Sequence, residues 1–218
     1  MVPNLKTARV SSRKQPKQAR SNDLVSAVLD AAVQVLMAEG AQRFTTARVA
    51  ERAGVSVGSL YQYFPNKASI LFRLQSDEWR RTSELLRSIL ADRSKPPMDR
   101  VRTLVHAFIR SECEEAQIRI ALHDAAPLYR DAPEAIEIRA ASDDIVESFM
   151  REILPNATEE SRLRTGDLVK TTLSGVGSSF SSTSRTNEEI VAYSEALADM
   201  MCAYLERLMA LGKRSSGG

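Results

Sequence analysis

The sequence predicts an all-α fold on three observations. Only 9 of the 218 residues are Gly and 8 are Pro, while Ala, Leu, Arg and Glu are frequent, a composition that favours helices. Apolar residues recur at i, i+3 and i+4 through most of the chain. Residues that begin or end helices separate these stretches. With 43% apolar residues, the chain can bury a core in one domain, or in a small domain and a larger one.

The charge is distributed unevenly. Residues 1–95 carry 16 Lys/Arg and 8 Asp/Glu, for a net charge of +8, whereas residues 96–218 carry 14 and 20, for −6. The simplest interpretation is that the basic half of the chain binds a polyanion. Residues 1–20 have six basic and no acidic side chains and are expected to be a disordered arm. The arm either has no role or contacts DNA phosphates or the minor groove.

A first helix is expected over residues 22–39, with Ser21 or Asn22 as its cap and Gly40 at its end. Its apolar stripe should pack against the helices that follow.

Residues 45–67 contain residue types that begin or end helices. Their order predicts two short helices followed by the start of a third. Hydroxyls and an amide can cap helices, Gly can end one in the left-handed conformation, and Pro can close another. These residues are Thr45, Thr46, Gly54, Ser56, Pro65 and Asn66. The arrangement is either a helix-turn-helix, whose second helix can enter the DNA major groove, or an ordinary helical corner. Side chains able to contact phosphates and bases favour the helix-turn-helix.

The same stretch contains the ungapped pattern Ala50-x-x-Ala53-Gly54-Val55-Ser56-x-Gly58-x-x-Tyr61-x-Tyr63-Phe64-x-x-Lys67. It resembles the DNA-binding domain of TetR-type bacterial transcriptional regulators, closely over residues 22–70 and beyond that only in general architecture. The resemblance implies an N-terminal three-helix domain with a helix-turn-helix and a C-terminal helical domain for effector binding and dimerisation.

The resemblance also implies roles for individual residues. Val57, Gly58, Ser59 and Gln62 occupy positions that face base edges. Gln62 could pair with adenine and Val57 could touch a thymine methyl group, while Gly58 permits close approach. The positions that usually contact phosphate are Thr46, Ser56, Tyr61, Tyr63 and Lys67.

The ring of Tyr61 could belong partly to the core, with only its hydroxyl outward. Ala47 stands where some relatives have a base-contacting Arg, so that contact should be missing, although Arg48 is adjacent.

A long helix over residues 67–92 would span about 39 Å, and the Ser-Lys-Pro-Pro stretch at 94–97 should break it. Five further helices are expected over about 98–115, 116–125, 134–154, 159–181 and 187–211, with Thr158 and Asn187 as caps of the last two. The predicted organisation is a basic arm at 1–20, a DNA-binding domain at 21–68, a ligand-binding and dimerisation domain at 69–211, and a flexible tail at 212–218.

The last two helices are candidates for a dimer interface. One carries small residues that permit close helix approach, and the other has an apolar face wider than one core contact needs. An ordinary intramolecular core is the alternative. The expected interface residues are Leu168, Gly175, Leu197, Met201, Tyr204 and Leu208.

Polar and aromatic residues within otherwise apolar helices are candidates for an effector pocket, although each could equally be a core or surface residue. The main candidates are Trp79, His106, Phe108, Cys113, His123 and Phe149, with Arg119, Asp124 and Tyr129 as further ones.

Several other classes are disfavoured. Cys113 and Cys202 lie outside any CxxC or Cys/His spacing, so free thiols are expected, and no metal or cofactor. The usual catalytic motifs are absent, and an enzyme would have to use His106, His123 or Asp124. No apolar run approaches the roughly 20 residues of a membrane span. A cytoplasmic protein is therefore expected.

The predicted function is a sequence-specific DNA-binding transcriptional regulator. It would be a homodimeric repressor, released from a near-palindromic double-stranded DNA operator when an unknown small-molecule effector shifts the 67–92 helix. The alternative is an effector-independent DNA-binding or architectural protein.

Overall fold

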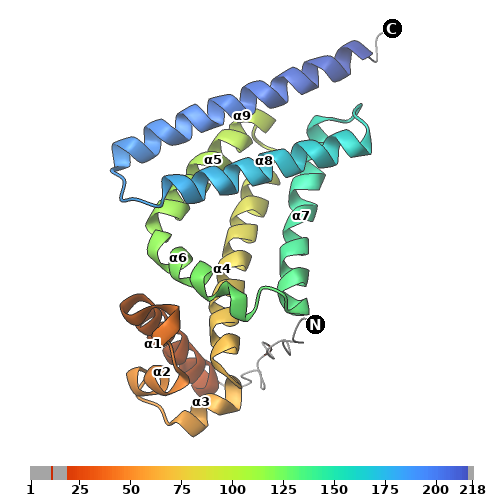
Figure 1. Cartoon of the computed structure of the whole chain (residues 1–218). Helices are drawn as coiled ribbons and strands as arrows, with labels where there is room; N and C mark the ends of the chain where they lie inside the picture. Colours follow the sequence, from red (N-terminus) through yellow and green to blue (C-terminus); the bar gives the residue numbers. More distant parts are fainter. Residues whose placement is uncertain (1–10, 12–18, 216–218) are drawn as a thin grey trace, which may run out of the picture. The chain divides into compact units, whose positions relative to one another are not determined.

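The computed structural model describes residue 11 and residues 19–215, apart from the side chains of residues 19, 20, 138–143 and 213–215. Within these residues it contains nine α-helices, one short 3-10 helix and no strand (Figure 1). The all-α prediction is confirmed. The expected basic arm lies almost entirely outside the described residues.

The described chain forms two compact units. Residues up to Arg80 together with Gln117–Arg139 make unit 1, and Arg81–Ala116 together with residues from Ala140 onward make unit 2. This division differs from the expected boundary after residue 68. The reason is that Leu122 and Tyr129 are buried in the same core as Leu71, so a segment distant in sequence joins unit 1.

Unit 1 contains the helix-turn-helix. Its elements are α1 (Ala19–Arg43), α2 (Thr46–Arg52), α3 (Val57–Tyr63), the first half of α4 (Lys67–Leu90), most of α6 (Ala116–Ala125), η1 (Ala126–Leu128) and the start of α7 (Pro133–Ile153). Helix α1 begins three residues before Asn22, so the expected caps Ser21 and Asn22 lie inside its first turns. Gly40 has φ +72° and interrupts α1, as predicted, because Gly adopts this conformation without a steric penalty.

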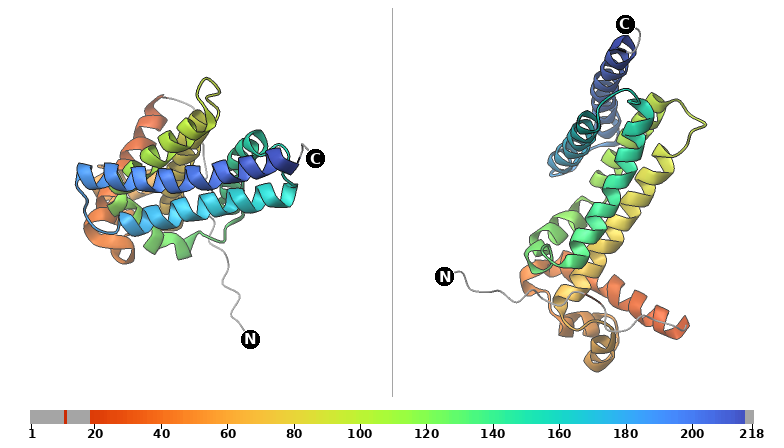
Figure 2. Two further views of the ribbon diagram at one scale, coloured as in Figure 1. Left: turned by 90° about the horizontal axis from the view of Figure 1, so that it is seen from above. Right: turned by 90° about the vertical axis from the view of Figure 1, so that its right-hand side faces the viewer.

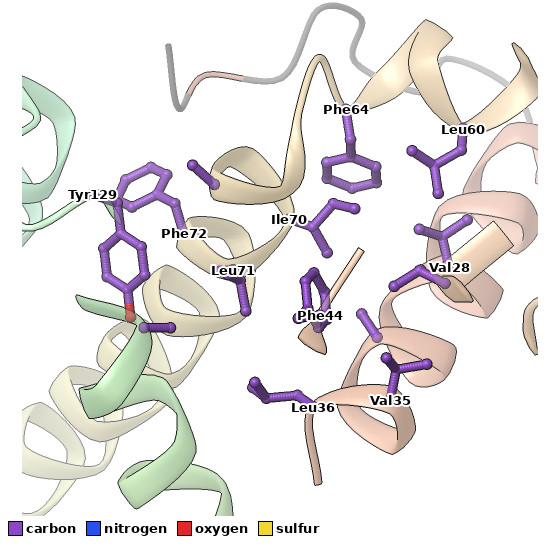
Figure 3. Packing of buried hydrophobic residues seen from close by; sticks show 14 of the residues in the cluster. Val28, Val35, Leu36, Phe44, Leu60, Phe64, Ile70, Leu71, Phe72 and Tyr129 are labelled. Atoms are coloured by element: carbon purple, nitrogen blue, oxygen red, sulfur yellow. The ribbon is translucent and has the colours of Figure 1, made fainter. Parts of the chain in front are cut away.

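One apolar core runs through unit 1. Phe44 and Leu60 are fully buried between α1, α3 and α4, and Phe64 and Ile70 lie next to them (Figure 3). The core continues along α4 to Tyr129. Because the short α2 and α3 have too few turns to be stable alone, this packing holds the helix-turn-helix in place.

Helix α1 requires a correction to the expectation about membrane spans. By length and composition alone, Ser21–Arg43 is apolar enough to cross a membrane. In the structure, however, Val28, Ala32 and Leu36 bury one face of this helix in the unit 1 core. We therefore interpret α1 as the core helix of a packed domain.

Unit 2 is built around α5 (Pro97–Glu114), which packs against both α8 (Glu159–Phe180) and α9 (Asn187–Ser215). Helices α8 and α9 run alongside each other (Figure 2). A Cβ at Gly177 would lie 2.9 Å from Phe108 Cε1 and 3.0 Å from Glu112 Cγ, so only Gly permits this approach of α8 to α5. The close helix approach expected of the small residues in this helix is thus present at Gly177.

The ends of α8 and α9 partly match expectation. Thr158 caps α8 by accepting a 3.2 Å hydrogen bond from the Ser161 N–H. For α9 the cap is Thr186 and not Asn187, because the Thr186 hydroxyl accepts from the Glu189 N–H while the Glu189 carboxylate accepts from the Thr186 N–H. This reciprocal pair is a capping box. Helix α9 extends to Ser215, beyond the expected end at Leu211.

Candidate nucleic-acid interface

Local side-chain caps shape the helix-turn-helix. Thr45 Oγ1 accepts a 3.3 Å hydrogen bond from the Arg48 N–H at the start of α2, and Ser56 Oγ accepts one of 3.0 Å from the Ser59 N–H at the start of α3. Gly54 has φ +66° in the turn between them. Asn66 Oδ1 caps α4 by accepting a 2.9 Å bond from the Ser69 N–H. The caps and the turn are as the sequence predicts.

The outer face of α3 carries three of the residues expected to face bases. Val57, Gly58 and Gln62 are exposed, whereas Leu60 on the opposite face is fully buried. A Cβ at Gly58 would meet only Ser56 Oγ, at 3.7 Å. Packing within the protein therefore does not require Gly at this position, and its effect is to leave the start of the helix bare for a close approach.

Hydroxyl groups pair beside this face. Ser59 is half-buried, and its Oγ lies 2.8 Å from Ser56 Oγ, so the expected base contact of Ser59 competes with a local hydrogen bond. Thr46 Oγ1 of α2 lies 3.0 Å from Tyr61 Oη of α3. This second pair brings two of the expected phosphate-binding groups together and joins the two helices.

The two tyrosines of α3 were both expected at phosphate-contacting positions, but they lie in different environments. Tyr61 is 39% exposed, so the alternative of a ring partly in the core is not what the structure has. Tyr63 is only 7% exposed and belongs to the unit 1 core. In a seven-residue helix the two positions point in different directions, and Tyr63 follows Leu60 on the buried side. Tyr63 consequently has little surface to offer a phosphate.

Arginines near the turn are engaged within the protein. Arg48 forms an ion pair with Glu39 and donates a 3.3 Å hydrogen bond to the Arg43 carbonyl, and Arg52 Nε donates a 2.6 Å bond to Gln34 Oε1. These contacts fix α2 against the end of α1. Ala47 cannot make the base contact that Arg makes in some relatives. Arg48 does not supply this contact in the structure either, because it is paired with Glu39. Sequence reasoning missed this positioning role because Glu39 and Gln34 belong to another helix.

Lys67 is the first residue of α4 and is half-buried. Unpaired N–H groups and the positive end of the helix dipole attract anions at such a position. The placement is compatible with the expected phosphate contact.

The expected effector residues are divided between the units. Trp79 and His123 belong to unit 1, whereas Phe108 and Phe149 are buried in the unit 2 core. His106, also in unit 2, has its Nε2 2.8 Å from Glu195 Oε2, and Cys113 is partly buried, which raises the pKa of its thiol. Of these six residues, Phe149 lines the groove found in unit 2, and the other five do not.

That groove has a volume of about 180 Å³ and lies between α4 and α7, with Leu90, Ile145 and Phe149 among its lining residues. Ligand pockets usually have about 300–1,000 Å³, so it is small for an effector site. A wider open groove of about 480 Å³ in unit 1 is lined by residues of α1 and α2. In the part of the chain that the structure describes, no cluster of three His, Cys, Asp or Glu residues could hold a metal.

The expected dimer residues fall into two sets. Leu168 and Tyr204 are exposed, and a Cβ at Gly175 would meet nothing within 4 Å. By contrast, Leu197 and Met201 are buried in the unit 2 core, and Leu208 packs partly buried against the same core. One face of α9 therefore packs inside the protomer, and an adjoining face is open.

Two family models match the chain. One, described as the tetracyclin repressor-like C-terminal domain, matches residues 96–208, and the other, described as bacterial regulatory proteins of the tetR family, matches residues 28–74. The chain belongs to the TetR family. It is thus a transcription regulator with a DNA-binding helix-turn-helix, and the resemblance found in the sequence is confirmed.

Individual relatives of this TetR-family protein are distant. Over 83 residues it is 35% identical to the nucleoid occlusion factor SlmA of Vibrio campbellii, and the match covers 38% of this chain and 42% of SlmA. The chain thus spans less than half the length of this curated relative.

Solved structures are similar over most of the chain. The fatty acid degradation regulator FadR from Bacillus halodurans has a TM-score of 0.66 and 18% identity, over 86% of this chain and 97% of FadR. FadR from Bacillus subtilis in complex with stearoyl-CoA has a TM-score of 0.61 and 17% identity, over 81% and 97%. At these identities the structures establish the TetR-family fold and not the ligand.

Proposed function

We propose that this TetR-family protein is a sequence-specific repressor that binds a near-palindromic operator as a homodimer and is released from it by a small-molecule effector. The observation that carries the proposal is the outer face of α3. Val57, Gly58 and Gln62 are exposed there beside the paired hydroxyls of Thr46 and Tyr61. The buried Leu60 anchors the opposite face, so the exposed face is held rigidly.

Base choice and general affinity would come from different residues. Val57 and Gln62 would read base edges in the major groove, with Gly58 permitting close contact. Thr46, Tyr61 and Lys67 would bind phosphates, which fix register without reading sequence. The basic arm at residues 1–20 would add salt-sensitive affinity.

The homodimer would form through α8 and α9. The open face of these helices carries large apolar side chains that a soluble monomer rarely gathers in one place. Gly175 leaves room for a second helix to approach closely. On α9 these side chains are Tyr193, Met200, Tyr204 and Leu211, which lie on one side of the helix, and on α8 Leu163 and Leu168 are exposed. A two-fold dimer would match a two-fold operator.

The effector would act through the helical C-terminal region. In the FadR complex from Bacillus subtilis, a protein of this fold holds stearoyl-CoA, which supports a small-molecule effector but does not identify one. Helix α4 would carry the change, because its first half belongs to unit 1 and its second half to unit 2. Like other TetR-family regulators, the protein would act in the cytoplasm, and no catalytic step is needed.

An effector-independent DNA-binding protein is a second candidate. Two observations favour it: the unit 2 groove is small, about 180 Å³, and one relative is a nucleoid occlusion factor. A thermal-shift screen followed by operator titration separates the candidates. A ligand that stabilises the protein and weakens operator binding supports the repressor, whereas stabilising ligands that leave operator affinity unchanged support the second candidate.

Replacing Gln62 by Ala should relax base preference and cost about 1–3 kcal/mol at the cognate operator. The loss arises because the amide can donate to and accept from one base edge, whereas Ala cannot. Affinity for random DNA should change little. Fluorescence anisotropy with operator and with scrambled duplexes measures both affinities.

Lys67→Ala is the matched comparison. It should weaken binding to operator and random DNA alike and reduce the slope of log affinity against log salt by about one. If both variants lost the same affinity on both kinds of DNA, the division between base-reading and phosphate-binding residues would be wrong.

A further inference from the structure

Residues 117–139 are an unexpected part of the unit that carries the helix-turn-helix. The chain enters this segment from unit 2 at Ala116 and returns to unit 2 at Ala140. Its apolar residues Leu122, Tyr129 and Ala132 are buried in the same core as Phe44 and Phe64. The segment is therefore packed against the DNA-binding helices while both of its ends continue into the other unit.

Polar side chains bind this segment to α4. The Tyr129 hydroxyl donates toward the Leu122 carbonyl at 2.8 Å and toward Gln75 Oε1 at 3.2 Å. Gln75 Nε2 donates to Glu78 Oε2 at 2.9 Å, and Glu78 Oε1 lies 3.0 Å from Arg119 Nη1. We call Gln75, Glu78, Arg119 and Tyr129 the Tyr129 network.

Two of the four members of the network are shielded from water. Tyr129 is 2% and Glu78 is 5% exposed, so their hydrogen bonds compete little with solvent and their loss would leave buried polar groups unsatisfied. Burial raises the pKa of Tyr129, and the charge of Glu78 adds to this effect. The phenol accordingly remains a hydrogen-bond donor at neutral pH.

The network is connected to the recognition helix by packing. The ring of Tyr129 lies 6.0 Å from that of Phe72 at an interplanar angle of 54°. Phe72 follows Ile70 and Leu71 on α4, which lie in one cluster with Phe64 at the end of α3 (Figure 3). Close-packed interiors transmit a displacement of one element to its neighbours, so the position of α4 against residues 117–139 affects α3.

We propose that Tyr129 and Glu78 are positioning residues for DNA binding, because the Tyr129 network holds residues 117–139 against the first half of α4 and thereby sets the orientation of α3. The inference rests on the proposed operator binding. It differs from a DNA-contact role because none of the four residues belongs to α2 or α3. It also assigns residues 117–139 to the part of the molecule that determines operator affinity.

Tyr129→Phe in the full-length chain removes only the hydroxyl and is the direct test. Operator affinity should fall about three- to tenfold, the effect of one buried hydrogen bond. The salt dependence of binding should stay the same, since no phosphate contact is lost. Hydrogen exchange without DNA should become faster in residues 57–72 as well as in 117–139. Glu78→Gln should change the same quantities in the same direction.

Ser76→Ala is the matched control. Ser76 is 1% exposed on the same helix, and its hydroxyl donates to the Arg73 carbonyl outside the network. This variant should lower thermal stability without changing operator affinity or exchange at residues 57–72. If Ser76→Ala lost as much operator affinity as Tyr129→Phe, the loss would come from general destabilisation and the proposal would be wrong.

Hydrogen exchange separates this inference from the proposed function. If the wild-type protein selects no operator, the proposed function fails, and the exchange pattern alone decides the role of the network. Faster exchange confined to residues 117–139 in Tyr129→Phe, with residues 57–72 unchanged, would show that the network stabilises only its own segment. Faster exchange extending into residues 57–72 would support positioning of α3.

Discussion

Arg100→Met should lower the free energy of unfolding by about 3 kcal/mol, the lower end of the range for breaking a buried ion pair. Arg100 is only 1% exposed. Its Nη1 donates to the Leu90 carbonyl at the end of α4 at 2.5 Å and to Glu152 Oε2 of α7 at 3.2 Å, and its guanidinium lies 5.1 Å from the centre of the Phe149 ring. One side chain of α5 thus joins three helices, and Met can replace only its apolar contacts.

Urea unfolding followed by circular dichroism measures this loss, and a double variant tests its cause. In Arg100→Met the Glu152 carboxylate loses its main partner and keeps the more distant Arg93 Nε, at 3.7 Å. Adding Glu152→Gln removes the uncompensated charge and should restore part of the stability. Equal stability of the single and double variants at pH 7 would contradict the ion-pair explanation.

The same pair gives the stability a pH dependence. The hydrogen bond from Arg100 holds the pKa of Glu152 below its ordinary value of 4.5. A carboxyl group with a lowered folded-state pKa contributes stability that is present above its unfolded pKa and is lost as the pH falls through its folded pKa. Wild-type protein should therefore lose this contribution below pH 4.5, and Arg100→Met should lack that component.

Met200→Glu should convert the proposed dimer into a monomer and reduce operator affinity by about 100-fold or more. In a dimer, binding of one subunit to its half-site raises the effective concentration of the second subunit at the other half-site, and a monomer loses this gain. Met200 is 53% exposed on α9 and lies on the same open face as Tyr204. In a dimer its side chain would be buried, and a carboxylate there would lose hydration without a partner. Sedimentation velocity measures the mass, and anisotropy measures the affinity.

Ile120→Glu is the matched control, since Ile120 is 51% exposed on α6 and receives the same new charge. It should leave the dimer intact. If Met200→Glu stayed dimeric, or if wild-type protein were monomeric at micromolar concentration, the proposed α8–α9 interface would be wrong.

Sequence reasoning predicted the features that depend on residues near one another in the chain. The caps formed by Thr45, Ser56 and Asn66 act on N–H groups three residues away, and Gly54 is needed for one turn. Helical periodicity likewise placed Leu60 and Phe64 on one face, and the family resemblance placed Val57 and Gln62 at base-facing positions. These local rules and the family pattern were sufficient for the fold class and the outer face of α3.

Features that depend on distant partners were not predictable. Tyr129 contacts Gln75, 54 positions away in sequence, and no local pattern indicates that residues 117–139 join unit 1. The apolar stripe of α9 did not reveal which positions face α5, so the expected interface included the buried Leu197 and Met201. Tyr61 and Tyr63 have similar chemistry, and only the packing of α3 distinguishes the exposed ring from the buried one.

The proposed function requires the outer face of α3 to read DNA sequence. Selection of bound duplexes from a random DNA pool, with wild-type protein and Gln62→Ala in parallel, measures this property. Wild-type protein should enrich one near-palindromic site with half-sites about one helical turn or more apart, and Gln62→Ala should lose preference at the same position in each half-site. Enrichment of no common sequence, or an identical site for both proteins, would contradict the proposed function.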